Sequence, residues 1–95
     1  MAVFVVSDPV STNRPDKYVL TMDGGAAFEI DPQTLAGGAV RLHYDVTSVT
    51  RGITHNMTVK AKISGAGGGE SASVPFSFVL SALPAAPSGI ALSVE

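Results

Sequence analysis

The sequence predicts an all-β fold, an antiparallel β-sandwich of about seven short strands. Apolar and polar residues alternate with period two in several segments, and turn residues recur at intervals of about 8–12 residues, the spacing of short strands in a sandwich. No segment shows an apolar stripe at helical spacing. Together these patterns are typical of two antiparallel sheets that pack face to face.

The clearest expected strand covers residues 40–49. Its apolar side chains, from Val40 to Val46, fall on one face, and its polar side chains fall on the other, as in a half-buried antiparallel strand. The other expected strands cover residues 2–6, 18–22, 26–30, 57–63, 74–80 and 90–94. Pro75 has no amide hydrogen, so its strand should lie at a sheet edge or contain a bulge.

Two glycine-rich segments predict connections between strands. Asp23-Gly24-Gly25 is a hairpin signal between the second and third expected strands. The run Gly65–Gly69 has no following Lys-Ser/Thr pair and does not open a helix, so it predicts a hairpin loop and not a phosphate-binding loop.

Composition limits the function. The chain has 95 residues, one domain's length, and its 45% hydrophobic and 15% charged residues exclude a disordered tail. The net charge is −2 and the six basic residues are scattered, so we expect no nucleic-acid partner. Cysteine is absent, which excludes disulfides and thiolate metal sites.

The segment Ser71–Val94 is uncharged and long enough to span a bilayer. Three prolines interrupt it, so we expect two strands joined by a proline-rich turn and no membrane association. The first residues lack the basic region of a signal peptide, which predicts a cytoplasmic or virion-associated location, unless the chain is a piece of a longer protein.

We identify no catalytic, cofactor-binding or metal-binding residues. His43 and His55 are the two histidines, and a zinc site would need further ligands such as Asp45 or Glu29. No serine lies in a nucleophile-elbow sequence, so we expect no enzymatic activity and no cofactor. Most aromatic side chains fall on inward faces, with Phe28 the one expected to be exposed.

The runs Val46–Gly52, His55–Ala61 and Gly69–Ser73 resemble the second half of a fibronectin type III or related immunoglobulin-like module. The resemblance implies an immunoglobulin/fibronectin III-like sandwich and places His55 where such domains have a corner tyrosine that bonds to upstream backbone. The chain departs from the family in having no Trp and only one strand before Tyr18. Residues 84–92 resemble the opening of such a module, although they come last.

We therefore expect a single sandwich domain over residues 1–95, and residues 84–95 leave several interpretations open. They form a permuted edge strand, pair with another copy of the chain, or act as a linker into a further module. We favour an ordered segment, because its apolar residues Ile90, Leu92 and Val94 would otherwise expose an apolar edge.

The function expected from these observations is that of a non-enzymatic structural or protein-interaction module. Its partner would be another protein or a second copy, joined through sheet edges by backbone hydrogen bonds. The resemblance implies a spacer, assembly unit or virion component of a phage-associated type. The alternative is a small carbohydrate- or ligand-binding module that uses the loops at one end of the sandwich.

Overall fold

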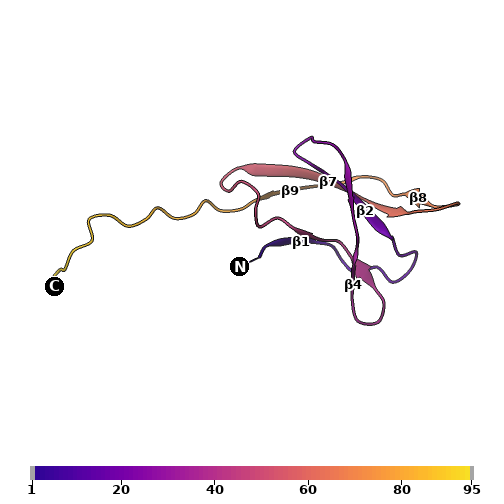
Figure 1. The fold of residues 1–95 in the computed structure, drawn as a ribbon, viewed down its shortest axis with the longest axis horizontal. Coiled ribbons are helices and arrows are strands. Elements are labelled where there is room, and N and C mark those ends of the chain that lie inside the picture. Colours follow the sequence, from indigo (N-terminus) through magenta and orange to yellow (C-terminus); the bar gives the residue numbers. More distant parts are fainter. Residues whose placement is uncertain (1, 95) are drawn as a thin grey trace.

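The computed structural model describes residues 2–94, and within that range the protein is all-β, with antiparallel sheets and no helix (Figure 1). Every strand pair is antiparallel. The strands are β1 (Phe4–Val6), β2 (Lys17–Met22), β3 (Phe28–Ile30), β4 (Gln33–Thr34), β5 (Val40–Arg41), β6 (His43–Asp45), β7 (Thr54–Ile63), β8 (Gly69–Glu70) and β9 (Val74–Val79).

The main sheet has five strands and is centred on β7. Its order is β3-β2-β7-β8, and β9 pairs with β7 beside β8. β2 and β3 form the expected hairpin, in which Asp23 and Gly24 both have a left-handed backbone, with φ of 52° and 74°. The glycine-rich run joins β7 to β8, so the hairpin predicted there is also confirmed.

A smaller layer lies over one face of this sheet. β1 pairs with β6, β4 pairs with β5, and an isolated bridge joins Val10 to Val40. The strand expected over residues 40–49 is divided, because its partner changes at Leu42. There the Leu42 amide donates to the Ser7 hydroxyl oxygen at 2.8 Å.

The core lies between the two layers. Tyr18 and Leu20 of β2 and Met57 of β7 pack against Leu42, and partly buried side chains such as Val5 surround them. Val40 and Val46 are also buried, so the inward face predicted for residues 40–46 is confirmed. Leu20 is completely inaccessible to solvent, at 0% exposure.

β9 forms an edge of the main sheet, as Pro75 predicts. Among the described residues β9 pairs with β7 alone, and Pro75 lies opposite Thr58 in that pair. A proline is accepted here because its missing amide hydrogen removes no bond from a second neighbouring strand.

The segment from Leu80 to Val94 contains no strand and extends away from the sheets (Figure 1). The strand expected over residues 90–94 is therefore not formed within this chain, because the segment runs away from every sheet edge. The radius of gyration is 19.0 Å, whereas a compact chain of this length would have about 12–13 Å. Residues 2–94 include no helix long and apolar enough to cross a membrane.

Leu20→Ala tests the position of the core. Removing this fully buried side chain should lower the free energy of unfolding by about 2–5 kcal/mol, since a cavity would remain between the layers. Val19→Ala is the matched control, because Val19 lies next to it on the opposite face of β2 and is only partly buried. Urea unfolding measures both, and equal losses would contradict the assigned faces.

Candidate functional site

An open groove separates β1 from β9 at one side of the molecule. It has a volume of about 430 Å³ and continues into a second hollow of about 350 Å³ at the start of β1. Its walls are mainly aliphatic and aromatic side chains, among them Val5, Val10, Leu42, Val59, Val74 and Phe76. We call it the β1–β9 groove. The groove lies where the smaller layer does not cover the main sheet.

The edge of β1 that borders this groove has no strand partner among residues 2–94. On its other edge, the Ser7 amide donates to the Leu42 carbonyl at 3.2 Å and the Val46 amide donates to the Val3 carbonyl at 2.9 Å. In an antiparallel ladder, successive residues direct their amide and carbonyl groups to opposite edges of the strand. The amides and carbonyls of Phe4 and Val6 therefore point away from β6 and are available to hydrogen-bond a further strand.

The inner face of β9 is exposed because the smaller layer does not cover this part of the main sheet. Val74 and Phe76 share the face of Phe78, which packs against the core, yet they are 61% and 46% exposed. The sequence analysis predicted the direction of these side chains but not their exposure. It was wrong about Phe28, which is half-buried and lies 5.6 Å from Tyr44 between ring centroids.

His55 is the one buried polar residue of the described chain. Its Nδ1 lies 2.7 Å from the Asp23 carboxylate, and its Nε2 donates to the Thr50 carbonyl oxygen at 2.7 Å. The other Asp23 oxygen accepts from the Asn56 amide at 2.8 Å. The contact with Thr50 is the bond to upstream backbone that the family resemblance implied for this position.

Hydrogen bonding at both ring nitrogens stabilises the charged imidazolium. The Thr50 carbonyl, followed by Asp23, raises the pKa of His55 above its ordinary 6.5. The hydrogen bond from His55, followed by that from the Asn56 amide, lowers the pKa of Asp23 below its ordinary 3.8. Because Nε2 is occupied by a backbone carbonyl, His55 has no free nitrogen with which to activate a nucleophile.

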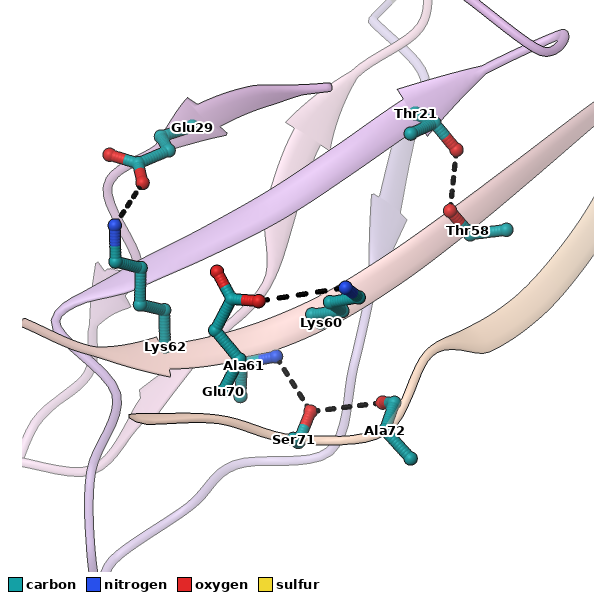
Figure 2. A network of polar contacts seen from close by, with 9 residues as sticks. All are labelled: Thr21, Glu29, Thr58, Lys60, Ala61, Lys62, Glu70, Ser71 and Ala72. Carbon is teal, nitrogen blue, oxygen red and sulfur yellow. Dashed lines mark hydrogen bonds and ion pairs between the residues drawn. The ribbon is translucent and has the colours of Figure 1, made fainter. Parts of the chain in front are cut away.

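The outer face of the main sheet is polar and its charges are paired. Figure 2 shows Lys62 bound to Glu29, Lys60 near Glu70 at 3.5 Å, and a hydrogen bond between the hydroxyls of Thr21 and Thr58. Exposed pairs of this kind contribute little to stability. The face is an ordinary solvated surface.

Ser71 attaches the segment between β8 and β9 to β7. The Ala61 amide donates to the Ser71 hydroxyl oxygen at 2.9 Å (Figure 2). The Ser71 amide in turn donates to the Ala61 carbonyl at 2.9 Å. Because Ser71 also lines the β1–β9 groove, these bonds hold one wall of the groove in place.

The residues considered for metal binding have other roles. His43 stacks on Phe4 with 4.0 Å between ring centroids, Glu29 binds Lys62, and the Asp45 carboxylate accepts from the Thr47 amide at 2.8 Å. Within the described range, no three His, Cys, Asp or Glu residues form a cluster that could hold a metal ion.

Sequence reasoning did not find the groove. The available signals were the presence of only one strand before Tyr18 and an edge strand marked by Pro75, but neither shows by itself which edge lacks a partner.

Comparison of the chain with protein-family models, with curated proteins and with solved structures found no match.

The His55–Asp23 pair predicts a specific pH dependence. Since the pKa of His55 is raised, its stabilising contribution is complete below about pH 6.5 and is lost as the pH rises through the raised value. The contribution of Asp23 is complete above about pH 3.8 and is lost as the pH falls through its lowered value. Urea unfolding between pH 3 and pH 9 should therefore show greatest stability between these limits.

His55→Gln should remove the decline above pH 6.5, and His43→Gln is the control that should retain it. NMR titration of the two imidazoles should give a higher pKa for His55 than the ordinary value. An unchanged decline in the His55→Gln variant would show that another group is responsible.

Proposed function

We propose that this chain is a non-enzymatic structural or protein-interaction module with an immunoglobulin- or fibronectin III-like β-sandwich. In this proposal it works by accepting an extended segment of polypeptide at the open edge of β1. The observation that carries the proposal is the β1–β9 groove, an apolar channel bordered by unpaired strand backbone.

The strand order supports an immunoglobulin-like arrangement. The order β9-β7-β2-β3 corresponds to strands G, F, C and C′ of such a domain, and the pair β1–β6 corresponds to strands B and E. His55 is the second residue of β7, and the corner residue of an immunoglobulin-like domain lies near the start of the matching strand F. The Nε2 of His55 donates to the Thr50 carbonyl, five residues upstream. In this alignment the free edge of β1 is the position of strand A.

Strand addition suits the chemistry of the groove. An added strand would bond to the backbone of Phe4 and Val6, and its alternate side chains would enter the space over Leu42, Val59 and Phe76. Backbone bonds supply affinity in this mode, and apolar contacts select the sequence. An assembly or spacer role, such as that of a virion component, is compatible with it because neither role needs reactive groups.

The distribution of aromatic residues does not favour the carbohydrate-binding alternative. All six aromatic side chains lie in strands, so the loops at either end offer no aromatic surface to a sugar ring. The groove is lined mainly by aliphatic side chains, with Phe76 as its one exposed aromatic side chain, and has few polar groups for hydroxyls.

The proposal predicts binding of extended peptides with alternating apolar residues. Ten-residue peptides of this pattern, selected from a displayed library on the immobilised protein, should bind and protect the amides of Phe4 and Val6 from hydrogen exchange. Val74→Asp puts a carboxylate into the apolar groove and should weaken binding about tenfold or more.

Ser77→Asp is the matched control, since Ser77 lies on the opposite face of β9 and is exposed. It should leave peptide affinity unchanged within about twofold, well inside the tenfold step. Failure of every selected peptide to bind, or equal binding by the Val74→Asp variant, would reject the strand-accepting edge.

A further inference from the structure

We propose that the strand accepted by the β1–β9 groove is the C-terminal segment of a second copy of this chain, residues 88–94. This inference rests on the proposed function and names its partner. It joins two features that the structure leaves unmatched, an apolar groove beside an unpaired edge and an apolar segment that lies against no sheet.

The donor segment has the pattern of a half-buried strand. Ile90, Leu92 and Val94 alternate with the small residues Ala91 and Ser93. In the isolated chain Ile90 is 83% exposed and Leu92 is fully exposed. Moving these exposed apolar side chains from water into an apolar groove lowers the free energy.

The segment is also competent to form a ladder. Residues 88–94 contain no proline, so each has an amide hydrogen, whereas Pro84 and Pro87 lie in the stretch that precedes it. Seven residues of strand span about 23 Å, whereas β1 has three residues, and the groove continues past β1 to Val10. The segment is therefore long enough to pair with all of β1 and to continue along the groove.

The tail is hydrogen-bonded to the rest of the described chain only at its beginning, through the turn that precedes β7. The Gly52 amide donates to the Leu80 carbonyl at 2.7 Å, and Arg51 donates to the Ser81 carbonyl at 3.3 Å. Beyond Ala82, the described part of the tail has no hydrogen bond to the sheets. It projects from the body along the longest axis of the molecule (Figure 1).

Chain direction favours a second copy over the chain's own groove. Leu80 lies at the Val3 end of the groove, while Ser71 and Val74 line the part that includes Val10. A tail that turned back from Leu80 would run parallel to β1. All strand pairs of the described chain are antiparallel, and an antiparallel donor would enter from the Val10 end, which a neighbouring molecule can reach without a reversal.

The resulting contact is head-to-tail. One copy donates its segment and accepts the segment of another. Such a contact either closes, as a reciprocal dimer or a larger ring, or continues as an open chain with one free donor and one free acceptor at its ends.

Sedimentation of the full chain over a range of concentrations tests this assembly. The wild-type mass should rise with concentration above that of the monomer, to a closed dimer or to larger assemblies. The double variant Ile90→Asp with Leu92→Asp should be monomeric, because its carboxylates would face the groove. The control Ala91→Asp with Ser93→Asp adds the same charge on the opposite face of the strand and should assemble as the wild type does.

A mixing experiment identifies the two surfaces directly. Val74→Asp blocks the acceptor, and Ile90→Asp with Leu92→Asp blocks the donor, so each variant alone should be monomeric. Mixed in equal amounts, they retain one intact donor and one intact acceptor and should form a 1:1 heterodimer that does not grow further. Val74 and the tail residues are exposed in the single chain, so in solution dilute enough for the wild type to be monomeric both variants should keep its thermal unfolding profile.

Wild-type protein that remains monomeric at all concentrations, or assembly that persists in the donor variant, would overturn the inference. The proposed function would still stand if selected peptides bind the wild type and fail to bind the Val74→Asp variant. It would fail separately if the wild type is monomeric and no peptide binds the groove.

Discussion

The antiparallel ladders along both edges of β7 position every other part of the main sheet. β2 pairs with it from Lys17↔Lys62 to Met22↔Met57, and β9 pairs from Thr54↔Val79 to Val59↔Val74. Because side chains alternate between faces, a slip of one residue would turn Met57 out of the core. The register of β7 thus determines which residues of β2 and β9 face the smaller layer.

That layer is shorter than the sheet beneath it, and this mismatch produces the groove. β1 contributes only three paired residues, so Val74 and Phe76 keep the inward direction of their strand without a neighbour to cover them. Fully burying one large aliphatic side chain contributes about 1.5–3 kcal/mol. Three such side chains contribute about 4.5–9 kcal/mol, which is comparable to the cost of association, about 4–15 kcal/mol. Ladder hydrogen bonds would add to this contribution.

His55 illustrates how a buried polar side chain is accommodated at the start of β7. The resemblance to fibronectin III-like modules implied a bond to upstream backbone, and the structure shows that bond with Thr50. It did not imply Asp23, which comes from the β2–β3 turn and lies 32 positions earlier. The left-handed backbone of Asp23 belongs to the turn that places its carboxylate beside the imidazole.

Local patterns were sufficient to predict the all-β class, the β2–β3 hairpin at Asp23-Gly24, the inward faces of β2 and β7, and the edge position of the strand that contains Pro75. Each of these depends on residues adjacent in the chain, whose alternation and turn geometry follow from backbone sterics. The division of residues 40–49, the partner of His55 and the exposure of Phe76 depend on contacts between distant segments. The sequence by itself therefore determined which way the strands face, including the alternation of Ile90, Leu92 and Val94. Only the tertiary structure decided that β1 keeps an unpaired edge and that residues 88–94 pair with no strand of their own chain, because both depend on which strands become neighbours.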